Sequence, residues 1–455
     1  MKTKRFLSIF FLALLLIGQL AVPVSAAEVT DPGIKAKAAL LVDQKTGAVI
    51  YALNEHSELY PASLTKIMTC LLVLEAIDDG RLRLSQEITA TPTALEGLAD
   101  DGSTAGIEAG EVLTVEELLY CLMVVSANEA GAILAEKVSG SVSSFVDRMN
   151  ARAQELGCED THFMNPHGYH DSQHYTSAWD LYLITRAALE HPMFMTVCDT
   201  SSHTVPATNM SGERQLNNTN FLIRSTREYY NADVHGVKTG SHSQAGNCLV
   251  TTAQHASMDL LCVILGAERV QDEKGIWWTY SFTETNRLYD WAFGNFSYQT
   301  LLKEDDVAGE APVSLSSTDH VTLRPARAVE LLLPTQTNLE ELEKAIKLNS
   351  DPVEAPINEG DVLGTMTVSL DGEVLAEVDL LALTDVEASR LRVLWRDIKN
   401  FFSTTAAKVI LGVAVVLAAI FGGWKLLFSR RRYRYGRSVG SGRSRGSYRG
   451  TRKRR

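Results

Sequence analysis

Apolar positions in the first 300 residues change between strand-like and helix-like spacing. Residues 38–43 and 48–51 are short apolar runs that flank the turn residues 44–47, which predicts a β-hairpin. Residues 67–77 are apolar on all sides, which indicates a helix buried within the domain. Further helices are predicted at residues 114–138, 143–156 and 277–293, and further strands at residues 247–253 and 260–265. We therefore predict an α/β domain over residues 28–300, with helices packed on an antiparallel sheet.

The pattern then changes to short β-type runs separated by turns. Residues 366–370 form one such run, which ends at the turn residues Asp371 and Gly372. We predict a small all-β domain over residues 311–383. Residues 384–404 follow, with large apolar side chains at helical spacing, which predicts an amphipathic segment at a membrane surface. These side chains are Leu391, Leu394, Trp395, Ile398, Phe401 and Phe402.

Two longer apolar stretches lie near the ends of the chain. Residues 1–27 combine a basic start, an apolar run and small residues at 25–27, which is typical of a secretory signal peptide; a retained N-terminal anchor is the alternative. Residues 409–428 carry one charge, Lys425, and are long enough to cross a hydrocarbon core of about 30 Å. We predict a transmembrane helix here; a buried helix of the soluble domain is the alternative. Residues 429–455 hold twelve Lys or Arg and no acid, which predicts a cytoplasmic tail.

The net charge of −12 therefore combines a basic tail with an acidic exported part that holds all 55 Asp and Glu. Such a tail can touch nucleic acid, but a role in topology and contact with anionic lipid is the interpretation we favour, and no nucleic-acid partner is expected. The six cysteines show no metal-like spacing, and several lie in apolar runs, which indicates buried core residues. No metal or cofactor is expected.

Ser63 and Lys66 stand three positions apart at a predicted helix start, so both side chains project from one face. The amine can take the proton of the hydroxyl, and the free backbone N–H groups of the first helical turn can stabilise an oxyanion. By itself this pattern is also typical of a helix-capping Ser followed by a solvated Lys.

Two tripeptides strengthen the catalytic interpretation. Ser126-Ala127-Asn128 follows an apolar helical run, and Lys238-Thr239-Gly240 precedes a predicted strand. Each tripeptide alone is common. Together with Ser63 and Lys66, and in this order, they match the three-part signature of β-lactamases and penicillin-binding proteins. The match predicts that three separated segments fold into one pocket.

The chain resembles the low-molecular-mass D-alanyl-D-alanine carboxypeptidases of peptidase family S11. The resemblance implies a penicillin-binding or β-lactamase-like transpeptidase domain, followed by the all-β domain and a C-terminal membrane attachment. It also implies removal of the terminal D-alanine from peptidoglycan stem pentapeptides, and acylation by β-lactam antibiotics. The segments that carry the resemblance are residues 61–69, Ser126 to Ala130, Phe145-Val146 with Met149-Asn150, Leu156-Gly157, residues 161–165, His174-Tyr175-Thr176 before Asp180, Asn218-Thr219-Asn220 and residues 236–240.

Under this resemblance, Ser63 attacks the carbonyl between the last two D-alanines and Lys66 accepts its proton. Burial and the second ammonium, Lys238, favour the neutral amine that a base requires. Ser126 relays a proton to the leaving amine. Asn128 holds Lys66 and the substrate amide.

The resemblance assigns substrate binding to the third motif. Lys238 and Thr239 receive the terminal carboxylate of the substrate, and Gly240 lets the strand approach the peptide closely. The backbone N–H groups of Ser63 and Ser241 are the candidates for the oxyanion hole.

One position departs from the family pattern. His242 stands where the family usually has a hydroxyl residue. It can donate to the carboxylate, a neighbouring Ser can replace the hydroxyl, or the ring can be structural. We expect Asn165, His167 and His174 to support the cleft, since a lone His is more often structural than catalytic.

Two other functions remain as alternatives. A class A-like β-lactamase needs a Glu that primes water for deacylation, and Glu213 begins a Glu-x-x-Leu-Asn pattern of that kind. Its place, much closer to Lys238 than to Ser126, argues against this role. The second alternative is a catalytically silent scaffold that binds the cell wall, although a scaffold has no need of two lysines beside an activated serine.

Overall fold

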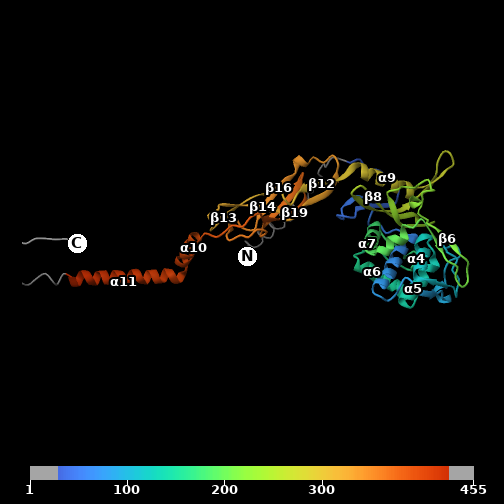
Figure 1. Cartoon of the computed structure of the whole chain (residues 1–455), viewed down its shortest axis with the longest axis horizontal. Helices are drawn as coiled ribbons and strands as arrows, with labels where there is room; N and C mark the ends of the chain where they lie inside the picture. The colour runs from blue at the N-terminus through green and yellow to red at the C-terminus, as the bar shows by residue number, and fades with distance from the viewer. Residues whose placement is uncertain (1–28, 430–455) are drawn as a thin grey trace, which may run out of the picture. The chain divides into compact units, whose positions relative to one another are not determined.

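The computed structural model describes residues 29–429 of the 455-residue chain (Figure 1). These residues form two compact units. The first contains residues 29–304, 327–345 and 367–378, and the second contains residues 305–326, 346–366 and 379–429. The predicted signal peptide lies outside the described residues, and so does the basic tail beyond Ser429.

A five-stranded antiparallel sheet lies at the centre of the first unit, in the order β2-β1-β9-β8-β7. Its edge strand β2 pairs with β1 across the hairpin that the sequence predicts. Strands β8 and β9 confirm the two predicted later strands. The bounds are β1 (Ala38–Asp43), β2 (Val49–Leu53), β7 (Val234–His242), β8 (Gly246–His255) and β9 (Met258–Ala267).

Both faces of this sheet are covered, so its central strands are mostly buried and mostly apolar. Leu40 and Val42 of β1 pack in one hydrophobic core, while Ala39 and Leu41 pack in another. Successive side chains of a strand point to opposite faces, so the two cores lie on opposite sides of the sheet. Figure 1 shows α4, α5, α6 and α7 gathered on one side of β8, and α9 on the other.

Three of the longer helices of the first unit begin at a polar capping residue. The side chains of Thr114, Ser141 and Ser177 accept hydrogen bonds from backbone N–H groups in the first turns of α4, α6 and α7. α2 lacks a polar face because it is buried on all sides, as the sequence predicts. The bounds are α2 (Lys66–Asp78), α3 (Pro92–Leu95), α4 (Val115–Val124), α5 (Asn128–Ser139), α6 (Val142–Glu155), α7 (Ala178–Leu189), α8 (Pro192–Cys198) and α9 (Tyr280–Asn295).

Two predicted helices differ from the structure. The pattern at residues 114–138 is two helices, α4 and α5, because Ser126 between them has a left-handed φ of 66° that a helix cannot continue through. The predicted helix at residues 277–293 starts later, at Tyr280. Trp277–Thr279 instead forms β11, which pairs with β10 (Arg269–Gln271).

Short strand pairs complete the first unit around the central sheet. β3 (Glu87–Thr89) pairs with β4 (Val112–Thr114), and β5 (Ser202–Val205) pairs with β6 (Arg214–Asn217). After α9, β12 (Phe296–Leu302) pairs with β15 (Val329–Pro334).

A six-stranded sheet in the order β16-β18-β19-β14-β13-β17 confirms the predicted β-rich region. The turn between β18 and β19 contains Asp371 with a φ of 50° and Gly372 with a φ of 85°. Two successive positive φ angles suit the twist of a tight hairpin. The bounds are β13 (Gly309–Ser314), β14 (His320–Pro325), β16 (Glu343–Leu348), β17 (Val353–Glu354), β18 (Val362–Leu370) and β19 (Glu373–Ala382).

Two helices end the described chain. α10 (Arg390–Ser403) exposes the predicted apolar side chains, including Leu391 and Trp395, which are 69% and 68% exposed. α11 (Thr405–Ser429) contains Thr405–Phe428, which is long and apolar enough to cross a membrane by its length and composition. Within the described residues it is the only helix of that kind.

Candidate active site

Ser63 lies in a short 3-10 turn, Ala62–Thr65, immediately before α2. The preceding Ala62 has a φ of 50°, an uncommon conformation for a residue with a side chain. The hydroxyl of Thr65 donates to Ala62 O at 2.9 Å and lies 2.8 Å from Nε2 of the buried His174. These contacts hold the turn in shape, so the half-buried Ser63 hydroxyl has a defined position at the start of the helix.

Lys66 is fully buried, and three oxygen atoms surround its amine. Nζ lies 3.0 Å from Ser63 Oγ, 2.7 Å from Asn128 Oδ1 and 2.6 Å from the carbonyl oxygen of His167. Burial lowers the pKa of Lys66 well below its ordinary value, and the nearby Lys238 ammonium lowers this pKa further, while Glu129 acts in the opposite direction. The amine is therefore much easier to deprotonate than a solvated lysine.

Ser126 and Asn128 occupy the junction between α4 and α5. The positive φ of Ser126 turns the chain sharply, so that Asn128 begins α5 with its side chain directed at Lys66. Ser126 Oγ is buried and has no hydrogen-bond partner within residues 29–429. A buried hydroxyl without a partner is costly, so this oxygen is available to a bound molecule.

Strand β7 carries Lys238, Thr239 and Gly240 along the same cleft. Lys238 is 1% exposed, and burial lowers its pKa to about 7. Its Nζ donates to Thr239 O at 2.8 Å. A Cβ at Gly240 would lie 2.8 Å from Pro61 O and 3.0 Å from Ser63 N, so only glycine allows this strand to lie so close to the nucleophile.

Two cavities meet at Ser63, and we name each after one lining residue. The Thr239 cavity has a volume of about 210 Å³, and the Tyr169 cavity has a volume of about 450 Å³. Ser63, Ser103 and Ser241 line both. Ser126, Thr219, Thr239 and Gly240 line only the Thr239 cavity, whereas Asn128, His242, Asp101 and His170 line only the Tyr169 cavity.

The structure thus brings the predicted site residues together. Lys66 and Lys238 lie buried beside the cleft, and the other predicted residues line its two cavities: Ser63, Ser126, Asn128, Thr239, Gly240, Ser241 and His242. In the part of the chain that the structure describes, no group of three or more His, Cys, Asp or Glu side chains is arranged to hold a metal ion.

His242 has a contact that supports the turn between β7 and β8. Its Nδ1 accepts hydrogen bonds from the backbone N–H groups of Gln244 at 3.2 Å and Ala245 at 3.0 Å. Burial lowers the pKa of His242, and His170 beside it lowers this pKa further, while the contact between Nδ1 and Gln244 Oε1 at 3.2 Å acts in the opposite direction. Ser241, rather than His242, lines the Thr239 cavity, so a serine supplies the hydroxyl nearest to Thr239 on this strand.

The residues expected to support the cleft do so through hydrogen bonds. Asn165 Oδ1 accepts from Gly168 N at 2.7 Å, and His174 Nδ1 accepts from Met164 N at 3.1 Å. Burial lowers the pKa of His167 and of His174 to about 3, so both rings are neutral under ordinary conditions. They hold the loop whose carbonyl, on His167, contacts Lys66.

Three residues near the site were given no role by the sequence analysis: Ser103, which lies in none of the motifs, and Thr219 and Glu129, which lie in segments that carry the resemblance. Thr219 Oγ1 lies 2.6 Å from Thr239 Oγ1, and Ser103 lines both cavities. The buried Glu129 accepts hydrogen bonds at Oε1 from Ala105 N at 2.6 Å and from Thr104 Oγ1 at 2.7 Å. These bonds attach the loop of residues 103–105, here named the Ser103 loop, to α5. The sequence feature that could have pointed to Glu129 is its place directly after Asn128 at a helix start, where an acidic side chain is favourable.

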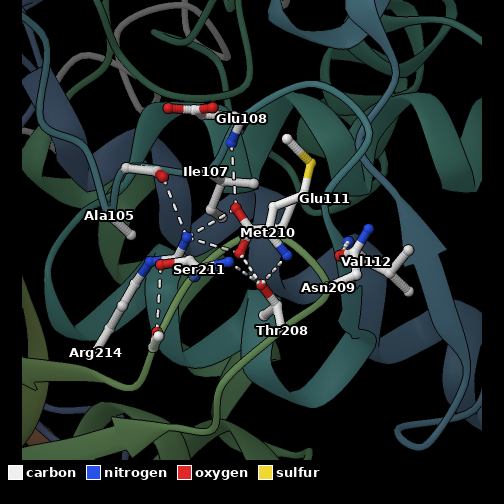
Figure 2. Close-up of polar contacts among 12 residues, drawn as sticks. Ala105, Ile107, Glu108, Glu111, Val112, Thr208, Asn209, Met210, Ser211 and Arg214 are labelled. Carbon is white, nitrogen blue, oxygen red and sulfur yellow. Dashed lines mark hydrogen bonds and ion pairs between the residues drawn. The ribbon is translucent and has the colours of Figure 1, made fainter.

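Glu213 does not reach the cleft. It is exposed, whereas its neighbour Arg214 enters a polar cluster (Figure 2). One nitrogen of Arg214 lies 2.7 Å from each carboxylate oxygen of the buried Glu111, and Thr208 Oγ1 donates to Glu111 at 2.6 Å. This cluster connects the β5–β6 hairpin, which leads into Thr219, to the segment that follows the Ser103 loop. The Glu-x-x-Leu-Asn pattern is therefore structural here.

Known proteins resemble this chain over most of its length. The peptidase S11 D-alanyl-D-alanine carboxypeptidase family matches residues 25–269, and the C-terminal domain of penicillin-binding protein 5 matches residues 296–388. D-alanyl-D-alanine carboxypeptidase DacF of Bacillus subtilis (strain 168) is 32% identical over 353 residues, which cover 78% of this chain and 86% of that protein. DacC of Escherichia coli (strain K12) is 30% identical over 378 residues, covering 80% and 87%.

Solved structures show the same relationship. Penicillin binding protein 5 from Haemophilus influenzae superposes with a TM-score of 0.62 at 30% identity, over 79% of this chain and 100% of that one. The Streptomyces K15 DD-transpeptidase covers 58% of this chain and 100% of its own, with a TM-score of 0.52 at 27% identity. The resemblance seen in the sequence motifs is confirmed, and the chain belongs to the peptidase S11 family of D-alanyl-D-alanine carboxypeptidases.

Proposed function

We propose that Ser63 is the acyl-forming nucleophile and Lys66 its base. Family membership makes the chain a serine-type D-alanyl-D-alanine carboxypeptidase and a penicillin-binding protein. The observation that carries the residue assignment is the 3.0 Å distance between Lys66 Nζ and Ser63 Oγ inside a buried environment. This distance lies within the range for direct proton transfer.

The contacts of Lys66 support its role as a base. A neutral amine has two hydrogens and one lone pair. The two shortest contacts, to His167 O at 2.6 Å and Asn128 Oδ1 at 2.7 Å, use the hydrogens. The lone pair is then left for the Ser63 hydroxyl, which can donate its proton as the oxygen attacks.

The reaction proceeds through an acyl-enzyme. Ser63 Oγ bonds to the carbonyl carbon between the last two D-alanines, and backbone N–H groups of Ser63 and Ser241 hold the oxyanion. The C–N bond breaks as Ser126 passes a proton to the leaving amine, which departs as D-alanine. Water then hydrolyses the ester and restores the Ser63 hydroxyl. The unpartnered buried Ser126 Oγ supports this relay role.

The Thr239 cavity receives the terminal carboxylate of the substrate. Hydroxyl groups of Thr239 and Thr219 lie 2.6 Å apart and line it together with Ser126. The buried Lys238 does not line this cavity, and its amine donates to Thr239 O at 2.8 Å, so it contributes a positive field more than a direct contact. The terminal carboxylate of the substrate then lies among the hydroxyl donors of the Thr239 cavity, on one side of Ser63.

The surrounding chain fits an enzyme that works outside the cytoplasm. We assign residues 1–27 to a signal peptide, 28–300 to the catalytic domain, 311–383 to a β-rich domain, and 384–404 to an amphipathic segment at the membrane surface. Residues 409–428 then cross the membrane once, with the catalytic domain outside and the basic tail of residues 429–455 inside the cell. The exposed apolar surface of α10 and α11 supports this assignment. The partners are the peptidoglycan stem peptide and the membrane, with β-lactams as inhibitors and no nucleic acid.

Release of D-alanine tests the proposal. The full chain in detergent should free D-alanine from a pentapeptide ending in D-Ala-D-Ala, and a fluorescent penicillin should label it for minutes. Absence of both signals would favour the silent scaffold. Turnover of penicillin within seconds would favour the β-lactamase.

A further inference from the structure

The anion that the Thr239 cavity is proposed to receive must approach an acidic domain. All 55 Asp and Glu of the chain lie between the predicted signal peptide and the basic tail. The described residues that line the cavity include no charged side chain, and the buried Lys238 beside it has a pKa of about 7, so near neutral pH it carries only part of a charge. A negatively charged surface repels a carboxylate unless positive groups lie close to the binding site.

The wall of the Thr239 cavity is connected to a surface loop through two stacked rings. Thr279, Ser281 and Phe282, from the end of β11 and the start of α9, line the cavity. The ring of Phe282 stacks on that of Phe221, with ring centres 5.4 Å apart and an angle of 18° between the planes. Phe221 begins the 3-10 turn Phe221–Ile223. The loop that follows this turn therefore lies near the cavity wall.

That loop places two arginines beside the Phe221 ring, and we name them the Arg224–Arg227 pair. The guanidinium carbon of Arg227 lies 4.5 Å from the centre of the ring, and that of Arg224 lies 5.9 Å from it. Nη1 of Arg224 also donates to Asn218 O at 3.2 Å. Asn218 directly precedes Thr219, which lines the cavity. Two separate sets of contacts therefore place the pair next to the Thr239 cavity.

No carboxylate balances the charge of this pair. Within residues 29–429 neither guanidinium forms an ion pair, because the hydrogen bonds of Arg224 go to a backbone carbonyl and to the neutral amide oxygen of Asn217. Burial lowers the pKa of Arg224, and the exposed Arg227 guanidinium lowers this pKa further, since the two charges repel each other. The exposed Glu228 of the same loop pairs with neither of them. Two like charges held together in this way attract an anion.

We propose that the Arg224–Arg227 pair attracts the terminal carboxylate of the stem peptide into the Thr239 cavity. This inference rests on the proposed function, which places that carboxylate in this cavity. The pair acts through its field rather than by contact, so its two members are positioning residues. The carboxylate keeps its charge in the bound substrate and in the transition state, so the field stabilises both alike. The pair should therefore lower KM and leave kcat unchanged.

The test uses a substrate whose only charge is its terminal carboxylate, Nα,Nε-diacetyl-L-Lys-D-Ala-D-Ala, and the full chain in a neutral detergent. In the double variant Arg224→Gln with Arg227→Gln, KM for D-alanine release should rise about three- to fivefold at about 0.01 M ionic strength, with kcat unchanged. The Debye length falls from about 30 Å at 0.01 M to about 3 Å at 1 M. At 1 M the double variant and the wild type should therefore have nearly equal KM values.

Three further variants separate charge from structure. Arg224→Lys with Arg227→Lys keeps both charges and should keep the wild-type KM. Arg227→Gln alone leaves the hydrogen bonds of Arg224 in place and should raise KM about twofold at low ionic strength. Arg83→Gln with Lys137→Gln is the matched control, because it removes two exposed positive charges from residues that line neither cavity, and its KM should not change. Thermal melting should show that all variants are folded.

An unchanged KM in the double Gln variant at low ionic strength would overturn the inference. A rise in KM that persists at about 1 M would do the same, because a screened field cannot cause it. An equal rise in the double Lys variant or in the matched control would also overturn it. Release of no D-alanine by the wild-type chain would instead reject the proposed function, and this inference with it.

Discussion

Asn128 Oδ1 accepts a hydrogen bond from Lys66 Nζ at 2.7 Å, although the two residues are 62 positions apart. The amide can accept only with its oxygen, so it fixes one hydrogen of the neutral amine and thereby orients the second hydrogen and the lone pair. A sharp turn at Ser126, with its left-handed φ of 66°, is what allows Asn128 to begin a helix that faces Lys66. The left-handed backbone at Ser126 therefore determines how the Lys66 amine is oriented, because it positions Asn128.

Replacing Lys238 should change the pH dependence of acylation. Burial, and then the Lys238 ammonium, lower the pKa of Lys66, so acylation rises with pH through a midpoint well below that of an ordinary lysine. Lys238→Met removes one source of repulsion, and the midpoint should move about one unit to higher pH. The pKa of Lys238 is itself about 7, so the repulsion is strongest below neutral pH. The rate of penicillin acylation measured against pH gives the midpoint, with the exposed Lys137→Met as control; a midpoint that stays in place or moves down would contradict this account.

Glu129→Gln should move the same midpoint in the opposite direction. The Glu129 carboxylate raises the pKa of Lys66, and glutamine removes that charge while its oxygen can still accept from Ala105 N. Of the other groups facing the amine, Lys238 and the neutral His167 stay in place. The acid limb of the acylation profile should shift to lower pH, and the exposed Glu228→Gln should leave it unchanged.

A second substitution separates charge from loop anchoring. Glu129→Ala removes the carboxylate and also frees the Ser103 loop, so KM for the peptide should rise about tenfold in addition to the pH shift. If Glu129 only anchors the Ser103 loop, Glu129→Gln will change the acylation rate by the same factor at every pH. The acid limb of the pH profile will then stay where it is in the wild type.

Gly240→Ala should reduce acylation at least a hundredfold while the protein remains folded. The added methyl would lie 2.8 Å from Pro61 O and 3.0 Å from Ser63 N, so the strand and the nucleophile turn must separate. A displacement of about 1 Å at a reacting group costs a factor of this order. Gly212→Ala is the control, because a Cβ there meets nothing within 4 Å. Acylation by penicillin within threefold of the wild-type rate would show that the close approach is not needed.

Breaking the Glu111–Arg214 pair should destabilise the catalytic domain. Glu111→Gln leaves the guanidinium of Arg214, which is 12% exposed, without its counter-charge, and the expected loss in unfolding free energy is about 3 kcal/mol. The double variant Glu111→Gln with Arg214→Met should recover part of this loss, because no unpaired charge remains. Denaturant unfolding measures both, with the exposed Glu108→Gln as control. Losses that simply add in the double variant would show that the two residues are not coupled.

Local chemistry explains what could be predicted from the sequence. Ser63 and Lys66 are three residues apart on one helix start, so their proximity follows from helical geometry alone. The apolar strands were recognisable because both faces of the sheet are buried, as the two cores around Leu40 and Leu41 show. The role of burial in lowering the pKa of Lys66 also follows from its place at the start of a buried, mostly apolar helix.

Contacts between distant loops could not be predicted. Asp101 and Tyr169 meet across 68 positions, and neither lies in a periodic element or a motif. The break at Ser126 interrupts an apolar pattern that is otherwise continuous, so periodicity alone joined α4 and α5 into one helix. The Tyr169 cavity and the anchoring of the Ser103 loop by Glu129 depend on such loop contacts, and only the folded structure reveals them.

The site of acylation tests the central claim most directly. Full-length chain treated with benzylpenicillin should gain one penicilloyl group, and mass spectrometry of its peptides should locate this group on Ser63. Ser63→Ala should melt at the wild-type temperature, gain no adduct and release no D-alanine. An adduct on another residue, or D-alanine release by Ser63→Ala, would contradict the account.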